Sequence, residues 1–289
     1  MSLICNPAVT LCLCFNSRVI EFSRKIYLNT LFSYSSELTN MAGLVDFRNE
    51  EEVKEYLKNI EIEFMFGCHK EHDQDNCYRL GEFLQTMKKN FSEASKIYKN
   101  CCEQFENAPC CYKAGQFHLV GRGDLEESST EAFKSFYVAC THDTYSDMGK
   151  NDAIAASCCN MGILLSQDDP NRENYMEILK NGKMASLSVA TAVLDSYTRA
   201  CNLNDKIGCN LLSMLHLAGF ENEVKQDYKL AAKYAEKACD LGEAKACHNL
   251  GLMFKRGDGV EQSDKRAMEF KTKYRDLIRG ELSLQFGNK

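Results

Sequence analysis

Two patterns of small, apolar and cysteine residues alternate along the chain. The first is a cysteine followed four residues later by glycine or serine, and its copies are Cys77/Gly81, Cys111/Gly115, Cys158/Gly162, Cys209/Ser213 and Cys247/Gly251. The second pattern has a small residue at position i, an aromatic residue or alanine at i+4, and a cysteine at i+8. Its copies are Ala94/Tyr98/Cys102, Ala132/Phe136/Cys140, Val193/Tyr197/Cys201 and Ala231/Ala235/Cys239. Because this spacing follows one stripe of an α-helix, each copy predicts a helix that a neighbouring helix can approach closely.

Together the two patterns predict helix–turn–helix units of about 34 to 38 residues. Turn-forming residues separate the paired helices at 89–90, 121–124, 218–220 and 257–259. The cysteines of the first pattern step by 34, 47, 51 and 38 residues, so the two long steps must carry insertions, at about 143–152 and 166–190.

Helical hairpins of this kind cannot bury an apolar face alone, so they stack on one another. This predicts an all-α fold, an α/α-repeat solenoid of tetratricopeptide-like units, rather than a compact globular bundle. We expect one repeat domain over residues 41–289, with a leading helix at about 50–66, about five hairpins to residue 279, the last as a cap around Ala267, and a short tail.

Residues 1–40 differ from the rest of the chain. The stretch 3–15 is apolar but interrupted, and no positive charge precedes it, as a secretory signal would require. Arg18, Arg24, Lys25 and several serines give a weak likeness to a transit peptide, which two glutamates reduce. Since Met41-Ala42-Gly43 has the form of a natural start, we expect either a weak targeting segment or an upstream gene-model extension, with little order.

Sixteen cysteines predict buried small residues, a metal scaffold or a disulfide framework. The cysteine that ends one hairpin is followed, after a short turn, by the cysteine that opens the next, giving Cys68–Cys77, Cys102–Cys111, Cys140–Cys158, Cys201–Cys209 and Cys239–Cys247. The pair Cys140–Cys158 fits this series if the insertion 143–152 loops out. Antiparallel helices joined by a tight turn can bring such positions to the Cα separation of about 4.4–6.8 Å that a disulfide requires.

The alternative is that these cysteines are small core residues copied with every repeat. Duplication explains one column of cysteines, but it gives no reason for two columns to match in every unit, so we favour inter-helix disulfides. Cys101, Cys110 and Cys159 stand outside the two columns and are candidates for free thiols. The register of residues 101 and 102 with 110 and 111 stays open, because both cysteines of each doublet are suitable partners.

Charge and motif content disfavour several functions. The formal net charge of −6 argues against binding to nucleic-acid phosphates, and no run of eighteen apolar residues predicts a membrane span. A phosphate-binding glycine loop and a nucleophile elbow are both missing, so no catalytic residue is predicted.

Two sets of residues have the chemistry of metal or haem ligands. Cys68, His69, His72 and Cys77 are zinc-ligand types, but ligation would need both cysteines reduced, against their predicted pairing, so no metal ligand is predicted. Six histidines and eleven methionines could supply axial ligands to a haem, yet no attachment motif identifies such ligands. His118 and His216 lie in apolar first helices, where we expect packing or groove roles.

The segment 238–251, Ala-Cys-Asp-Leu-Gly-Glu-Ala-Lys-Ala-Cys-His-Asn-Leu-Gly, is similar to the Sel-one-like repeat, a relative of the tetratricopeptide repeat. More specifically, residues 41–289 resemble the cysteine-rich mitochondrial members of this family that assist assembly of cytochrome c oxidase, most closely at 41–47, 76–80 and 196–201. The likeness covers the chain after residue 40. It departs in the two insertions and in the additional cysteines 101, 110 and 159.

The resemblance implies a soluble protein of the mitochondrial intermembrane space, oxidised by the local disulfide relay and acting in assembly of respiratory complex IV. An oxidising compartment is also what stable disulfides need. We expect a disulfide-stapled scaffold whose concave side binds other proteins, among them complex IV assembly or copper-delivery factors. The competing hypothesis, also implied by the family, is a haem-binding thiol–disulfide reductase acting on copper-delivery partners. If the protein is an enzyme, it is therefore expected to be a thiol–disulfide oxidoreductase.

Overall fold

The computed structural model describes the backbone of residues 45–145 and 148–286. These residues form helices joined by short loops, and among them the one β feature is an isolated bridge between Phe220 and Val224. The predicted all-α repeat fold is confirmed. The expectations for residues 1–40 fall outside this part of the chain. The described chain divides into two compact units, an amino-terminal unit of residues 45–128 and a carboxy-terminal unit of residues 129–286.

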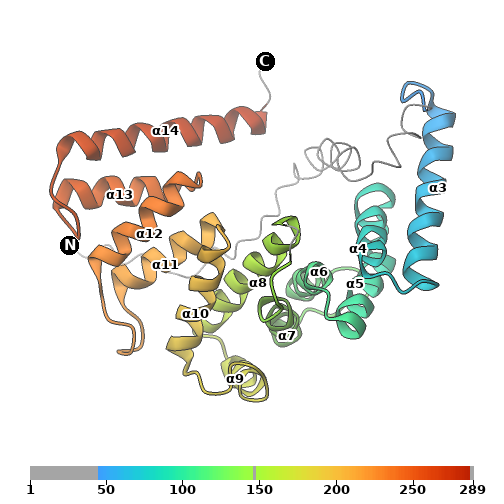
Figure 1. Ribbon diagram of the computed structural model, residues 1–289, viewed down its shortest axis with the longest axis horizontal. Helices are drawn as coiled ribbons and strands as arrows, with labels where there is room; N and C mark the ends of the chain where they lie inside the picture. Colours follow the sequence, from blue (N-terminus) through green and yellow to red (C-terminus); the bar gives the residue numbers. More distant parts are fainter. Residues whose placement is uncertain (1–44, 146–147, 287–289) are drawn as a thin grey trace. The chain divides into compact units, whose positions relative to one another are not determined.

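The amino-terminal unit begins with the leading helix, which runs three residues beyond its predicted end. Its elements are α3 (Glu50–His69), α4 (Gln74–Phe83), the short π-helical continuation η1 (Leu84–Lys88), α5 (Phe91–Phe105) and α6 (Ala108–Val120) (Figure 1). Each α-helix packs on the next one along the chain. The helix α3 buries Ile60 and Phe64, and the Phe64 ring lies edge-on to Phe83 of α4 at 6.5 Å between centroids.

The carboxy-terminal unit continues the same order of alternating helices. Its elements are α7 (Ser129–Cys140), α8 (Met148–Ser166), α9 (Arg172–Lys180), α10 (Val189–Asn202), α11 (Lys206–Ala218), α12 (Tyr228–Asp240), α13 (Ala244–Arg256) and α14 (Asp264–Phe286). Each helix packs on its successor, except that α8 packs mainly on α10 while the short α9 lies against α7 and α8. The first helices of the five predicted hairpins are α4, α6, α8, α11 and α13, and the second helices are α5, α7, α10, α12 and α14.

All four predicted turns contain a residue in the left-handed backbone region. These residues, with their φ angles, are Lys89 (57°), Gly121 (57°), Gly219 (73°) and Gly257 (81°). A left-handed residue reverses the chain directly after a helix and is the usual way in which helices end. The turn chemistry therefore set the places where one helix ends and the next begins.

The prediction that the insertion 143–152 loops out is wrong for its second half, because α8 begins at Met148. In the first turns of α8, the Asn151 side chain donates to the Tyr145 carbonyl (2.9 Å) and accepts from the Tyr145 N–H (2.8 Å). These two hydrogen bonds hold the remaining loop to the helix. The insertion thus lengthens α8 instead of leaving the repeat.

The second insertion contains an ordered helix, α9, that belongs to the core of the carboxy-terminal unit. Tyr175 of α9 is fully buried, and its ring stacks on Phe133 of α7 with centroids 4.5 Å apart. Its hydroxyl donates to Asp169 (2.8 Å), and burial raises the pKa of Tyr175 far above its ordinary value. The residues between α8 and α10 are therefore a packed addition to the third hairpin.

In two hairpins the helices meet where a glycine of the first helix faces a tyrosine of the second. A Cβ atom at Gly81 would lie 2.4 Å from the Tyr98 ring, and one at Gly162 would lie 2.5 Å from the Tyr197 ring. In the hairpin of α11 and α12 the glycine is replaced by Ser213, and the tyrosine position holds alanine. The Ser213 hydroxyl donates to the Ala231 carbonyl (2.7 Å). A larger residue at the glycine position is thus accompanied by a smaller residue at the tyrosine position.

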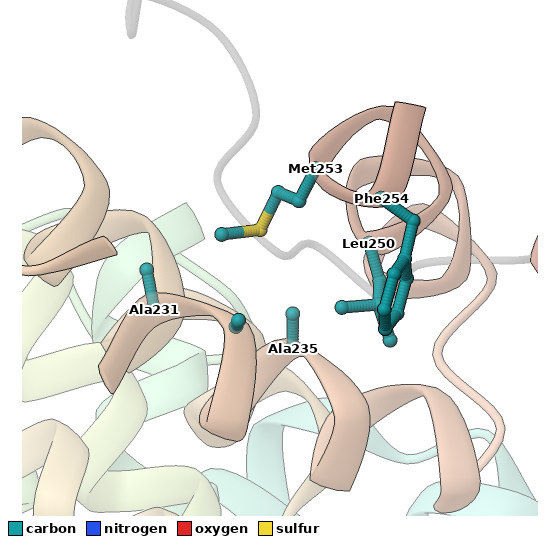
Figure 2. Close-up of a cluster of buried hydrophobic side chains, with 6 residues drawn as sticks. Ala231, Ala235, Leu250, Met253 and Phe254 are labelled. Carbon is teal, nitrogen blue, oxygen red and sulfur yellow. The ribbon is translucent and has the colours of Figure 1, made fainter. Parts of the chain in front are cut away.

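The last hairpins pack through the alanine stripe that the second pattern predicted. Figure 2 shows alanines of α12 facing three larger side chains of α13, in a cluster of Ala231, Ala232, Ala235, Leu250, Met253 and Phe254. Phe270 of α14 stacks on Phe254 at 5.5 Å, and the Arg266 guanidinium lies 4.2 Å from the centre of the same ring. Arg266 also pairs with Glu236 of α12 (3.0 Å). The helix α14 covers α13, the position that we predicted for a cap.

Replacing Gly162 by alanine should lower the free energy of unfolding by about 1–3 kcal/mol, because the new methyl group would overlap the buried Tyr197 ring. The measurement is urea denaturation followed by circular dichroism. The matched control is Gly280→Ala in α14, where a Cβ meets no atom within 4 Å. There alanine should be neutral or stabilise by up to ~1 kcal/mol through helix propensity. Equal effects of the two changes would contradict the glycine–tyrosine contact.

Candidate functional site: the paired cysteine columns

The structure brings the ten column cysteines together in the pairings expected from their spacing. Their Sγ atoms are at bonding distance, and the Cα separations are 4.5 Å for Cys68–Cys77, 4.6 Å for Cys102–Cys111, 4.8 Å for Cys140–Cys158, 4.4 Å for Cys201–Cys209 and 4.7 Å for Cys239–Cys247. Each pair joins the second helix of one hairpin, or the leading helix, to the first helix of the next hairpin. Within the part of the chain that the structure describes, no disulfide joins the two helices of one hairpin.

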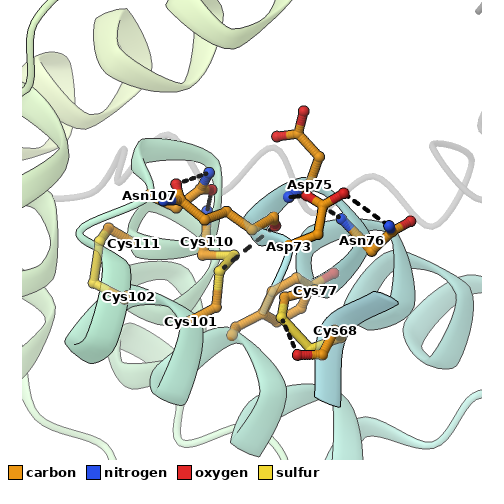
Figure 3. The surroundings of a disulfide bond; sticks show 12 residues. Cys68, Asp73, Asp75, Asn76, Cys77, Cys101, Cys102, Asn107, Cys110 and Cys111 are labelled. Carbon is orange, nitrogen blue, oxygen red and sulfur yellow. Dashed lines mark hydrogen bonds between the residues drawn. A yellow bond between two sulfur atoms is a disulfide. The ribbon is translucent and has the colours of Figure 1, made fainter. Parts of the chain in front are cut away.

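The expectation of free thiols at Cys101 and Cys110 is wrong in this structure. Their Sγ atoms lie 2.16 Å apart, beside the neighbouring pair Cys102–Cys111, so two disulfides join α5 to α6 (Figure 3). The Cα separation of this second pair is 5.9 Å, wider than in the columns. The physical reason is that consecutive residues of a helix are only about 100° apart, so both cysteines of each doublet can face the neighbouring helix. The equal spacing of nine residues in both pairs was the sequence signal for this register.

Helix capping explains why the column cysteines occur at a constant spacing. The first-helix cysteine lies four residues after the N-cap residue in four hairpins, where the N-cap residues are Asp73, Asn107, Asp205 and Glu243. Its backbone N–H donates to the N-cap carbonyl at 2.9–3.2 Å, the first such bond of the helix. The side chains of Asp73, Asn107 and Asp205 accept hydrogen bonds from first-turn N–H groups. The cap therefore fixes where the cysteine stands relative to the turn.

The partner cysteine stands in the last turn of the preceding helix, so the pair spans only the loop and two helix ends. In four of these pairs the Sγ atom of the second cysteine lies close to the carbonyl oxygen of the first, at 3.7 Å (Cys77), 3.6 Å (Cys158), 3.5 Å (Cys209) and 3.6 Å (Cys247). All ten column cysteines are buried. The repeated geometry shows that one local design serves several hairpins, including the one with the longer loop before Cys158.

Cys159, the remaining described cysteine, keeps its thiol and is buried in α8. Its Sγ donates to Asp205 Oδ1 (3.3 Å), the oxygen that also accepts the Gly208 N–H (2.6 Å) at the start of α11. A Cβ at Gly208 would lie 3.1 Å from this sulfur, so the glycine leaves room for it. The thiol lies between α8 and the start of α11, and the contact with Asp205 could not be foreseen from the sequence.

The histidine candidates separate into exposed and packed residues. His69 and His72 are exposed, and the two cysteines of their segment are paired with each other at 2.10 Å, so in this state they offer no thiolate to zinc. His118 and His216 are buried seven residues after a column cysteine, at the position that holds Leu84 and Leu165 in other hairpins. Among the described residues, no three His, Cys, Asp or Glu side chains are placed to hold a metal ion.

A shallow depression lies over the loop between α11 and α12. It has a volume of about 370 Å³ and is lined by residues 218–222 and 224–226. Its lining contains the charged side chains of Glu221 and Lys225 and no cysteine or histidine. In the described part of the chain, no helix has the length and apolar character needed to cross a bilayer.

Known proteins are similar to this chain in its repeats and over most of its length. The Sel1 repeat family model matches residues 108–140, 207–243 and 244–270. The proteins named cytochrome c oxidase assembly factor 7 from Xenopus tropicalis and Homo sapiens are 38% and 36% identical to this chain, over 83% and 82% of it and 94% of their own length. The protein of that name from Danio rerio is 34% identical over 86% of this chain and all of its own length.

The chain belongs to the cytochrome c oxidase assembly factor 7 family. A crystal structure of a Sel1 repeat protein from Oxalobacter formigenes is also similar, with a TM-score of 0.57, 18% identity and 81% coverage of both chains, and this likeness concerns the fold alone. The resemblance inferred from the cysteine-rich repeats is thereby confirmed. For a member of the cytochrome c oxidase assembly factor 7 family, the arrangement that recurs from hairpin to hairpin is the pair of cysteine columns.

The six pairs predict the thiol content of the oxidised protein. Titration under denaturing conditions without reductant should give at most four thiols, because twelve of the sixteen cysteines are paired. Cys101→Ser should add one thiol, by releasing Cys110, and Cys101→Ser/Cys110→Ser should leave the count unchanged. If both residues were free thiols, the single and double variants would instead lose one and two thiols.

The buried His216 should make stability fall at acidic pH. Burial lowers the pKa of His216, and the nearby Asp227 only partly opposes this. The unfolded chain therefore binds more protons, so the free energy of unfolding falls as the pH drops below the ordinary histidine value of about 6.5. His216→Leu should lose less stability than the wild type between pH 7.5 and pH 5 in urea denaturation. The exposed-site control His248→Gln should keep the wild-type dependence, and parallel loss in His216→Leu would contradict the assignment.

Proposed function

We propose that the protein is an assembly factor for cytochrome c oxidase that acts as a disulfide-stapled, protein-binding scaffold in the mitochondrial intermembrane space. The role in assembly is supported by relatives of that name, which align with this chain over 94% or more of their own length. The observation that carries the scaffold mechanism is the placement of every described disulfide between one hairpin, or the leading helix, and the next hairpin.

The scaffold mechanism follows from two kinds of contact, packing within a hairpin and disulfides between hairpins. Inside a hairpin, the helices are held by close packing such as that of Gly81 on Tyr98 and Gly162 on Tyr197. Between the hairpins that a disulfide joins, the covalent bond fixes which helix turns meet. The outward side chains of the joined helices are then held in constant register before any partner arrives. A surface that is ordered in advance loses less conformational entropy when it binds, which favours a binding role.

The proposed compartment rests on the chemistry of the thiols. Six disulfides persist only where reducing systems of the cytosol do not act. An assembly factor for the mitochondrial oxidase that needs such conditions is best accommodated in the intermembrane space. The partners expected there are assembly or copper-delivery factors of complex IV and the disulfide relay that oxidises the chain.

The test is complementation in cells of the protein's own species in which the gene is disrupted. Wild-type protein should restore assembled cytochrome c oxidase on native gels and oxygen consumption driven by reduced cytochrome c. Cys201→Ser/Cys209→Ser should restore less of both, because release of this bridge is expected to cost about 2–3 kcal/mol of stability in the chain-entropy model. Normal oxidase levels in the disrupted cells would refute the role in assembly.

Cys159→Ala separates the scaffold from the reductase hypothesis. Among the described cysteines it removes the one thiol outside the six pairs, and it does so at a buried position where alanine fits. The scaffold proposal expects full complementation by this variant and no Soret band in the purified protein after addition of haem. Loss of complementation by soluble, folded Cys159→Ala, or a stoichiometric Soret band, would favour a haem-binding thiol–disulfide reductase. Protease protection in intact but not in osmotically ruptured mitochondria tests the compartment.

A further inference from the structure

The leading helix α3 carries an apolar surface that is about half exposed to solvent. Ile62, Met65 and Phe66 stand at i, i+3 and i+4, on the side of the helix opposite its buried residues, and are 54%, 41% and 56% exposed. They make up three of the eight exposed large apolar side chains of the described residues. We call these three residues the α3 apolar face. Clustered exposed apolar side chains of this kind mark interaction sites more often than isolated ones do.

The repeat itself does not account for the α3 apolar face. Ile62 stands six residues before the column cysteine of its helix, and the same position in α5, α7, α10 and α12 holds Lys96, Lys134, Asp195 and Lys233. All four of these charged residues are exposed. The position is therefore a solvent position in each of those second helices. An isoleucine there, extended by Met65 and Phe66, is an addition specific to α3.

The helix at the other end of the chain shows what a solvated terminal helix looks like. The outward side of α14 has one exposed large apolar residue, Met268, among charged and polar residues that include Lys265, Glu269, Arg275, Asp276 and Arg279. Terminal helices of repeat arrays need such a polar outer side for solubility. Because the last two turns of α3 expose three large apolar residues beside the polar Glu63 and His69, we infer that another element covers this apolar part of the helix.

We propose that residues 24–38 of the same chain dock on the α3 apolar face. This segment precedes α3 directly and has apolar residues at Tyr27, Leu31, Tyr34 and Leu38, the i, i+4, i+7, i+11 spacing of one helix stripe. Residues 46–49 form a hydrogen-bonded turn at the start of α3, so the free connection is residues 39–45, which can extend over about 23 Å. Ile62 lies about 18 Å along α3 from Glu50, so the segment can reach the α3 apolar face.

Charge favours this occupant over a second copy of α3. The helix α3 contains six glutamates and two lysines, so two copies would repel each other. The segment offers Arg24 and Lys25 against the single Glu37, which complements the acidic helix. The proposal departs from the expectation of little order in residues 1–40, since that expectation considered the segment without a surface to bind. It does not depend on the proposed function.

Photo-crosslinking of the full chain tests the contact directly. A benzophenone amino acid in place of Phe66 conserves the aromatic ring at an exposed position, so folding should be preserved. Irradiation should crosslink it to peptides within residues 24–38, and a mixture of ¹⁴N- and ¹⁵N-labelled protein should show that both peptides come from one chain. The control is the same amino acid at Lys96, an exposed position of α5 equivalent to Ile62, which should not reach this segment. Crosslinks between chains, crosslinks elsewhere or none at all would overturn the proposal.

Hydrogen–deuterium exchange of the full chain gives an independent measurement. In the wild type, amides of residues 24–38 should exchange more slowly than in Ile62→Lys/Phe66→Lys by about tenfold or more, because docking suppresses local opening. Ile62→Lys copies the charge found at the equivalent positions 96, 134 and 233, and Phe66→Lys copies Lys237 of α12. The buried Ile60 and Phe64 are left intact, so amides of α4 to α6 should be unchanged. Equal exchange of residues 24–38 in the two proteins would overturn the proposal.

Discussion

The disulfide between the second helix of one hairpin and the first helix of the next is the contact on which the rest of this protein depends. A single helical hairpin cannot bury its apolar stripe, and each repeat must therefore meet its neighbour in one register. In four places the bridge supplies that register between the last turn of one helix and the fourth residue after the next N-cap.

Size complementarity inside the hairpins is the second constraint, and it acts where no covalent bond does. Gly81 and Gly162 admit the rings of Tyr98 and Tyr197, whereas the hairpin with Ser213 has alanine in place of the ring and a hydroxyl-to-carbonyl hydrogen bond. Tightly packed interiors tolerate neither a cavity nor an extra methyl group without cost, so the two positions must vary as a pair. The repeat thus uses a bridge between hairpins and a fitted contact within them, and this division leaves the outward side chains available for binding.

Exposure decides how the remaining chemistry can be used. The thiol of Cys159 is buried against Asp205, whereas Ile62, Met65 and Phe66 of α3 are open to solvent. A buried thiol reacts only when the structure opens, whereas an exposed apolar surface is available to a partner at once. The surface of this protein therefore offers binding more readily than redox chemistry, in keeping with a scaffold in cytochrome c oxidase assembly.

The sequence by itself determined the all-α repeat, the turns, the five cysteine pairs of the two columns and the family, because each depends on spacing along one helix or across one short turn. Tertiary structure decided what spacing leaves open. The doublets at 101–102 and 110–111 form two bridges because both helices present adjacent positions to each other. The helix α9 is held in the core because the Tyr175 ring stacks on the ring of Phe133, forty-two residues earlier. The Cys159 thiol of α8 donates to Asp205 at the start of the next hairpin, and Ile62 of α3 remains exposed. Contacts between distant residues depend on how helices stack in space, and no local periodicity encodes that.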